Sequence, residues 1–453
     1  MNSRKLGLFF IFIISIWKLC GAFSKEAVDE KGKESDKTLN AVYNAIVDIN
    51  GSGDYASLQE AINQVPEGRT SPWTIFIMNG RYEELVRIPK EKRFIHLIGQ
   101  DVDSVVITYK INCANPENYE DAGRAFSKVH FEQNDCATVV VEAPDFYAEH
   151  ISFENSWGVE SQSGPQALAM KLTNDRAAFY HCRFRSFQDT WMTSTKGVND
   201  RTYANQCWIE GAVDYFYGGG NAYIENSTFY NVRSGSVIVA PSQAEGTKYG
   251  YVFNHCVVDG NSKAADGRLK LGRPWHNQPL AVYLYTTFKI PVDPEGWTDM
   301  GPSAKLFAEY QSKDVEGRPL DLSQRRTWYQ QNEREGGKRI TGLSAILTDD
   351  QVTSFSYENV IQGTGGWNPR SFFEEDGEIS NVKVDKGMIY WKGIAGARGY
   401  AIFFKGKVLG FSSSTNFKFK EQTDSDIEKL KIYPINQYGS LVGRHHSPLD
   451  AIK

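Results

Sequence analysis

The chain has 453 residues, of which 41% are hydrophobic and 13% aromatic, so it is long enough to bury a large core and to form more than one domain. Its formal net charge is −5 at pH 7 and no stretch is strongly basic, which argues against nucleic acid as a partner.

The N-terminus has the composition of a signal peptide. Basic residues precede an apolar run from Leu6 to Trp17, and small residues precede a cleavage position after Ala22. The run is too short to span a bilayer. A lipid anchor at Cys20 is the alternative, although the residues before it fit that signal poorly. We expect a signal peptide over 1–22, a disordered tail over 23–39, no membrane span, and a monomeric protein that is secreted or periplasmic.

Folded sequence begins at Asn40, and after a turn a capping box of Ser57 and Glu60 opens a short amphipathic helix. Leu58, Ala61, Ile62 and Val65 share one face of it, as a cap on the open end of a solenoid requires. From Trp73 onward the pattern changes to short strands separated by Gly, Asn, Asp and Pro, which is typical of an all-β fold.

A weak internal repeat runs through these strands. We align His150, Cys182, Cys207, Asn226 and Cys256 as equivalent positions, with spacings of 32, 25, 19 and 30 residues. Variable spacing at constant phase predicts a right-handed parallel β-helix over 40–330, with loops of different length projecting from a fixed stack of strands. A β-sandwich is the alternative, but it does not explain the repeated phase.

Two aspartates occupy the same phase of this repeat. Asp189 follows Cys182 by seven residues, Asp214 follows Cys207 by seven, and the two acids are 25 residues apart. If 25 residues form one coil, the aspartates lie about 4.8 Å apart, one strand spacing. Aromatic neighbours and a second carboxyl both raise carboxyl pKa values. The pair is therefore predicted to hold one acid and one anion near neutral pH.

Other polar residues complete a candidate site. Arg273 is placed to keep one aspartate ionised. Gln188 adjoins Asp189, and Gln166 lies 22 residues earlier, about one coil upstream, so both amides are candidates to donate to an oxyanion. Taken singly, each residue has a structural explanation as a turn aspartate, a stacked glutamine or a surface ion pair. Their shared phase favours acyl transfer from an ester.

Five segments, in this order, resemble the signature blocks of the pectin methylesterases: Gly80-Arg81-Tyr82-Glu83-Glu84, Gln166-Ala167-Leu168-Ala169-Met170, Gln188-Asp189-Thr190, Val213-Asp214-Tyr215-Phe216-Tyr217-Gly218 and Leu271-Gly272-Arg273-Pro274-Trp275. The similarity extends from about residue 41 to 326. It implies a parallel β-helix, methyl-esterified homogalacturonan (pectin) as the substrate, and no metal or organic cofactor.

The resemblance also implies a role for each site residue. Asp214 is the nucleophile, Asp189 the general acid and then base, and Arg273 the partner of the nucleophile, while the two glutamines are the oxyanion donors. The sugar cleft is lined by Tyr217, Trp275 and Trp297, with one wall altered by Trp191 and Met192, where many relatives carry a Leu-Tyr pair.

Other functions remain open at this point. The protein is alternatively an esterase for another acyl group on a polysaccharide, or a β-helical polysaccharide lyase or glycosidase, since those enzymes also use paired acids. Inverting hydrolysis needs its carboxyls farther apart than one strand spacing, which argues against it. A non-catalytic wall-binding protein would keep the aromatic residues without turnover.

The remaining expectations concern the C-terminal part and the cysteines. Residues 331–375 are interpreted as a linker and trailing segment, with a polar linker at 332–337 and a stretch over 348–368 that packs back on the solenoid. Residues 376–453 resemble a fibronectin type III-like β-sandwich, and a spacer or stabilising role is favoured over carbohydrate binding.

Cys113 and Cys136 flank an insertion (110–136) without an assigned role and are candidates for a disulfide, whereas the other three mature cysteines are expected to be buried thiols.

Overall fold

The computed structural model describes residues 42–114, 136–193, 197–373, 377, 379–419, 429–444 and 449–450. The expected signal peptide and tail (1–39) and most of the insertion (115–135) lie outside these residues. All described residues belong to one compact unit, Thr38–Lys453. Among them, no helix is long and apolar enough to cross a membrane.

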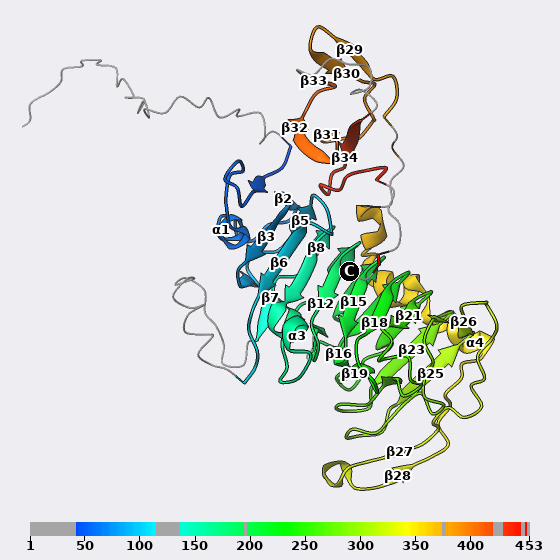
Figure 1. The fold of residues 1–453 in the computed structure, drawn as a ribbon. Coiled ribbons are helices and arrows are strands. Elements are labelled where there is room, and N and C mark those ends of the chain that lie inside the picture. The colour runs from blue at the N-terminus through cyan, green and yellow to red at the C-terminus, as the bar shows by residue number, and fades with distance from the viewer. Residues whose placement is uncertain are drawn as a thin grey trace, which may run out of the picture. The chain divides into compact units, whose positions relative to one another are not determined.

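Three parallel sheets of ten, nine and seven strands form a solenoid in the described part of the chain (Figure 1). From β2 to β22 each coil of the backbone contributes one strand to each sheet, whereas the coils at the two ends lack one or two of the three strands. Sheet A contains, in spatial order, β1 (Ala45–Val47), β2 (Trp73–Ile77), β5 (Ile95–Gly99), β8 (Phe146–Glu149), β11 (Ala177–Tyr180), β14 (Arg201–Asn205), β17 (Asn221–Glu225), β20 (Tyr251–Asn254), β23 (Leu280–Leu284) and β25 (Leu306–Tyr310).

The other two sheets complete each coil. Sheet B contains β3 (Gly80–Glu83), β6 (Val105–Tyr109), β9 (Ser152–Asn155), β12 (Arg183–Arg185), β15 (Trp208–Gly211), β18 (Thr228–Asn231), β21 (Val257–Gly260), β24 (Thr287–Phe288) and β26 (Lys313–Asp314). Sheet C contains β4 (Val86–Ile88), β7 (Ala137–Val141), β10 (Leu168–Leu172), β13 (Trp191–Thr193), β16 (Val213–Gly218), β19 (Val237–Pro241) and β22 (Lys270–Gly272). The parallel β-helix expected from the sequence is confirmed.

The solenoid is held together by a continuous apolar interior. Alternate side chains of the three sheets point inward and form one buried cluster along its length. Helix α1 (Leu58–Asn63) caps one end, and its Leu58, Ala61 and Ile62 join the same cluster with Val65, as predicted.

The sequence repeat corresponds to the corner between sheets A and B, with a correction of phase. Strand-to-strand hydrogen bonds place Ile151, Cys182, Cys207, Ser227 and Cys256 in one column. The positions equivalent to the cysteines are therefore Ile151 and Ser227, each one residue after the predicted His150 and Asn226. The preceding column has left-handed backbones, with φ of 56° at His150, 50° at His181, 53° at Gln206, 51° at Asn226 and 53° at His255. Polar residues tolerate this conformation best, which explains the polar residue at that step of the repeat. The three cysteines are buried free thiols, as expected.

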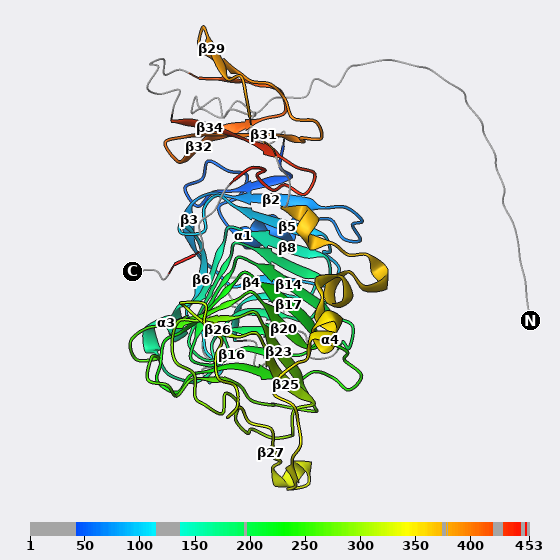
Figure 2. The same ribbon diagram turned by 90° about the vertical axis from the view of Figure 1, so that its right-hand side faces the viewer.

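The segment after the solenoid covers the outer face of sheet A. It contains α4 (Asp349–Val352), η3 (Thr353–Phe355), η4 (Glu358–Gln362), η5 (Gly363–Gly365) and η6 (Pro369–Phe372). Figure 2 shows this segment beside β14, β17, β20 and β23 of sheet A. Its Tyr357 and Ile361 pack on Tyr203 and Tyr223, so the stretch over 348–368 packs back as predicted. The interpretation of 332–337 as a linker is wrong. These residues form the turn, including η2 (Glu333–Glu335), of a hairpin between β27 (Tyr329–Gln330) and β28 (Arg339–Ile340).

The C-terminal residues form two small antiparallel sheets with a shared core. One contains β29 (Lys383–Asp385), β30 (Met388–Tyr390) and β33 (Asn416–Lys418), and the other contains β31 (Gly399–Phe404), β32 (Lys407–Ser412) and β34 (Leu430–Ile435). Buried side chains from both sheets, including Trp391 and Tyr400, pack together.

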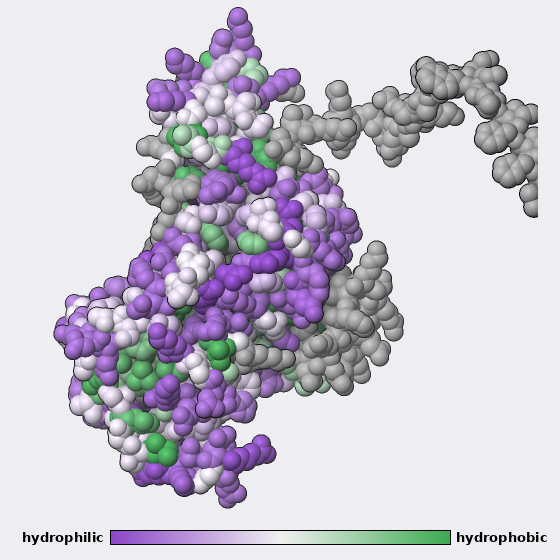
Figure 3. All heavy atoms as spheres, turned by 180° about the vertical axis from the view of Figure 1, so that it is seen from behind, coloured by the Kyte–Doolittle hydropathy of each residue, from purple (hydrophilic) through white to green (hydrophobic). Residues whose placement is uncertain are grey.

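These C-terminal sheets are packed on the first coils of the solenoid. The Phe411 ring lies 5.1 Å from Tyr43 and 4.9 Å from Phe76, and the Tyr43 hydroxyl donates to the Gly439 carbonyl at 2.8 Å. The C-terminal sheets thereby cover the apolar outer face of β2 and its neighbours. The face of the molecule opposite to that in Figure 1 is mostly hydrophilic, with apolar atoms exposed mainly over the lower part of the solenoid (Figure 3).

If this packing stabilises the whole protein, Phe411→Ala should lower the free energy of unfolding by about 3 kcal/mol, since it removes a buried ring from a packed aromatic cluster. Leu409→Ala, on the same strand but 39% exposed, is the matched control and should change stability little. Urea unfolding followed by tryptophan fluorescence measures both. Equal effects of the two substitutions would contradict the role of this contact.

Candidate functional site

Asp189 and Asp214 lie on consecutive coils in the same register. Gln188 pairs with Val213 and Trp191 with Phe216, so the 25-residue offset holds on both sides of the aspartates. The Asp189 amide donates to the Val213 carbonyl at 3.0 Å. Both aspartates have left-handed backbones, with φ of 62° and 50°, which turns both carboxyls the same way at the start of their strands.

The strand that carries Asp214 has an irregular register. Its pairing with β19 shifts between Val213 and Phe216, which inserts an extra residue where Asp214 and Tyr215 lie. Such bulges re-aim side chains and are common next to functional sites. Tyr215 is buried in the interior, whereas Asp214 points to Arg273.

The two carboxyls have opposite electrostatic surroundings. Arg273 binds Asp214 with both arms of its guanidinium, from Nε to Oδ1 at 2.9 Å and from Nη2 to Oδ2 at 2.6 Å. Burial, together with the negative charge of Asp214, raises the pKa of Asp189 from 3.8 to about 8, although Tyr217 and Arg273 oppose the shift. Near neutral pH, Asp189 therefore holds a proton beside the Arg273-bound carboxylate of Asp214.

The two glutamines lie one coil apart beside the aspartates. The Ala167 amide donates to the Gln188 carbonyl at 3.2 Å, which aligns Gln166 with Gln188 on neighbouring coils. Gly164 lies close to the Gln188 side chain, so that a Cβ added to Gly164 would be only 2.8 Å from Oε1 of Gln188. Both side chains are half-buried, so their amides remain available at the surface of the site.

Aromatic and apolar side chains form the floor beside the aspartates. Tyr217 and Trp275 meet edge to face at 5.6 Å, and both pack with Met192 and Leu168 in a cluster on the outer side of sheet C. The Tyr217 hydroxyl also donates a hydrogen bond to Asp189, a contact that sequence reasoning missed. The equal spacing of Tyr217 from Asp214 and of Met192 from Asp189 indicates that Tyr217 stacks on Met192, but it gives no signal for the hydrogen bond to Asp189.

Two predicted cleft residues are wrong. Trp191 is 0% exposed and stacks on Phe184 at 3.9 Å inside the solenoid, because side chains alternate along β13 and only Met192 points outward. Trp297 is also 0% exposed and packs on Phe307 at 4.7 Å. Neither ring can line a cleft. Within the described ranges, no cluster of three His, Cys, Asp or Glu side chains is placed to hold a metal ion.

Comparisons with known proteins agree on one family. A model of the family described as Pectinesterase matches residues 44–363. Pectinesterase 31 of Arabidopsis thaliana is 35% identical over 268 residues, which cover 58% of this chain and 80% of the relative. A pectinesterase of Petunia integrifolia is 30% identical over 303 residues, covering 64% and 75%.

Solved structures share the fold. Pectin methylesterase from carrot superposes with a TM-score of 0.59 at 24% identity, covering 74% of this chain and 97% of the carrot chain. A pectin methylesterase crystallised with a hexasaccharide superposes with a TM-score of 0.55 at 22% identity, covering 72% and 98%.

The raised pKa of Asp189 predicts a pH-dependent cost of folding. The folded protein keeps a proton on this carboxyl that the unfolded chain releases above about pH 4, so the stability due to the protonated group is lost as the pH rises to about 8. Asp189→Asn should therefore gain stability relative to the wild type between pH 4 and 8. Thermal unfolding across that range measures the difference.

Asp266→Asn is the control for this experiment. Asp266 is exposed and its pKa is lowered by the hydrogen bond from Ser234, so its replacement should show no gain as the pH rises. A constant difference between Asp189→Asn and the wild type across the pH range would contradict the raised pKa.

Proposed function

The chain belongs to the pectinesterase family, and we propose that it hydrolyses its ester through a covalent intermediate on Asp214. It is a carboxylic ester hydrolase that removes methyl groups from pectin. The observation that carries the mechanism is the difference in surroundings between two aspartates on adjacent coils, of which Asp214 alone is bound by both hydrogen bonds of Arg273. Asp214, bound by Arg273, is the anion that attacks, and Asp189, with its pKa of about 8, is the acid.

The first half of the reaction forms an acyl-enzyme. A carboxylate oxygen of Asp214 attacks the carbonyl carbon of the C6 methyl ester, and the carbonyl oxygen becomes an oxyanion. The amides of Gln166 and Gln188 donate to that oxygen. As the tetrahedral intermediate collapses, Asp189 gives its proton to the departing methoxyl oxygen and methanol leaves.

The second half restores the enzyme. Asp189, now ionised, takes a proton from water, and the resulting hydroxide attacks the acyl carbon. The bond to Asp214 breaks, the free galacturonate carboxyl leaves, and both aspartates return to their starting states.

Activity should decline as the pH rises through about 8, because Asp189 then loses the proton needed in the first half of the reaction.

The rival polysaccharide chemistries fit this geometry less well. Inverting glycoside hydrolysis uses carboxyls roughly 6.5–9.5 Å apart to admit a water molecule, whereas aspartates in register on adjacent coils are about one strand spacing apart. The floor formed by Tyr217, Trp275 and Met192 supports binding of a sugar chain, since apolar and aromatic side chains stack on sugar rings.

The surroundings of the catalytic solenoid are also part of the proposal. Export through a signal peptide over 1–22 is supported by the Cys113–Cys136 disulfide, which persists in oxidising compartments. We propose that 376–453 is a fibronectin type III-like module that stabilises the solenoid. Its two facing antiparallel sheets and its apolar contacts with Tyr43 and Phe76 support that role.

Asp214→Ala should lower methanol release from highly methylated pectin by at least about 1,000-fold, because the nucleophile is lost. Asp259→Ala, which removes a half-buried acid paired with Lys289 on the outer solenoid, is the control and should keep normal turnover. Methanol and polymer length are measured together. Turnover by Asp214→Ala would refute its role, shortening of the polymer would favour a lyase or glycosidase, and acetate release from acetylated pectin without methanol would favour another acyl group.

A further inference from the structure

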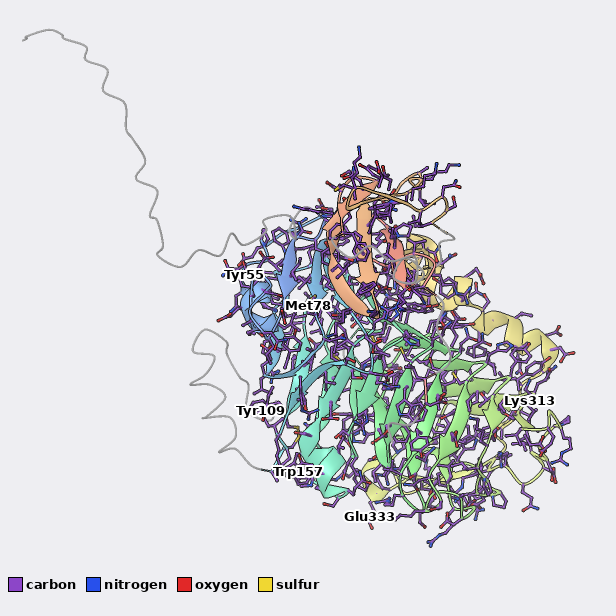
Figure 4. The ribbon with its side chains drawn as sticks, turned by 45° about the horizontal axis from the view of Figure 1, so that its top comes forward. Tyr55, Met78, Tyr109, Trp157, Lys313 and Glu333 are labelled. Carbon is purple, nitrogen blue, oxygen red and sulfur yellow. A yellow bond between two sulfur atoms is a disulfide. The ribbon has the colours of Figure 1, made fainter. Side chains whose placement is uncertain are left out.

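A disulfide lies at the edge of the candidate site. Cys113 follows the end of β6 and Cys136 precedes β7, and the two are bonded with their Cα atoms 4.9 Å apart. Figure 4 labels Tyr109, the last residue of β6, and Trp157 on the neighbouring α3 (Ser156–Ser161), which mark this side of the solenoid.

The backbones of the two bonded cysteines are hydrogen-bonded to the segment that carries Gln166, directly before β10. The Cys113 amide donates to the Gln166 carbonyl at 2.9 Å, and the Leu168 amide donates to the Cys136 carbonyl at 3.0 Å. The regular pairing between β7 and β10 begins only at Ala137 and Leu168. Gln166 therefore lies before that ladder, and its carbonyl is held by a residue outside the strands.

A buried asparagine completes this backbone arrangement. Asn155 Nδ2 donates to the Leu168 carbonyl at 3.0 Å and to the Cys136 carbonyl at 3.5 Å. The same side chain accepts from the Trp157 amide at 3.2 Å, which ties the start of α3 to this point. Gln166 is thus hydrogen-bonded to Cys113, and Leu168 is hydrogen-bonded to Cys136 and to the side chain of Asn155.

The disulfide also packs against the floor of the site. Cys113 and Cys136 belong to the outer apolar cluster of Leu168, Met192, Tyr217 and Trp275. Tyr217 in turn donates to Asp189. In this cluster the disulfide makes apolar contacts only, whereas the backbones of its two cysteines are hydrogen-bonded directly to Gln166 and Leu168.

We propose that the Cys113–Cys136 disulfide is a positioning element for the oxyanion donor Gln166, so that its reduction lowers kcat while the fold persists. The inference rests on the role proposed above for Gln166. An oxyanion donor stabilises the transition state only if it is held in place before the reaction. When the bond is open, Cys113 is no longer tied to Cys136, and the Gln166 carbonyl loses its fixed partner. Substrate binding by Trp275 and Met192 is retained, so KM changes little.

A double-mutant cycle tests this coupling. The paired substitution Cys113→Ser and Cys136→Ser should lower kcat for methanol release about tenfold, with KM within about twofold of wild type. Added to Gln166→Ala, the same pair should lower kcat by less than about twofold, because the residue being positioned has already lost its amide. An equal tenfold loss in both backgrounds would overturn the proposal, since general destabilisation acts independently of Gln166.

Reversible reduction of the wild type provides a second measurement that does not depend on the folding of a variant. Mild reductant should lower kcat by the same factor, reoxidation should restore it, and circular dichroism should stay unchanged. The paired serine variant is the control and should be insensitive to reductant, which excludes an effect through the three buried thiols. Full activity of the reduced wild type would overturn the inference alone, whereas absence of methanol release from the oxidised wild type would overturn the proposed function.

Discussion

Constant register between two neighbouring coils is the constraint on which the site depends. The strands β11, β12 and β13 pair with β14, β15 and β16 of the next coil at the same 25-residue offset, so no register shift separates Asp189 from Asp214. In a parallel ladder, equal offsets place equivalent side chains one above the other. Other coils of the solenoid are longer or shorter because their loops differ in length. Between the two coils that carry Asp189 and Asp214, no loop changes the relative position of the two aspartates.

Proximity alone would give two similar carboxyls, and their surroundings make them different. Arg273 donates two charge-assisted hydrogen bonds to Asp214, one to each carboxyl oxygen. For Asp189, burial and the negative charge of Asp214 outweigh the hydrogen bond from Tyr217 and the more distant charge of Arg273, so its pKa rises to about 8. One arginine thus assigns the two roles, in the way that unequal environments separate acid from base in other carboxyl pairs.

The solenoid also requires cover for its outer face. The side chains of Phe76, Tyr147, Tyr203 and Tyr223 point outward from sheet A. Because they are apolar or aromatic, another layer of the protein must cover them to remove them from water. The segment over 348–373 covers the later coils, and the C-terminal sheets cover the earlier ones. On the outer side of sheet C, Met192 and Trp275 of the apolar cluster remain partly exposed beside Asp214, which is itself 5% exposed.

The sequence by itself determined the parallel β-helix, the stacking of Asp189 on Asp214 and the candidates Gln166, Gln188 and Arg273, because a repeat of constant phase specifies which residues share a position on successive coils. Only the tertiary structure decided which face each side chain takes. A shift of one residue reverses the facing of a strand, so the sequence does not distinguish Trp191 from a cleft residue or His150 and Asn226 from the cysteine column. Trp297 lies outside the strands, and its burial against Phe307 is a tertiary contact. The hydrogen bonds of Cys113 to Gln166 and of Cys136 to Leu168 likewise join residues far apart in the chain, and no local sequence pattern predicts them.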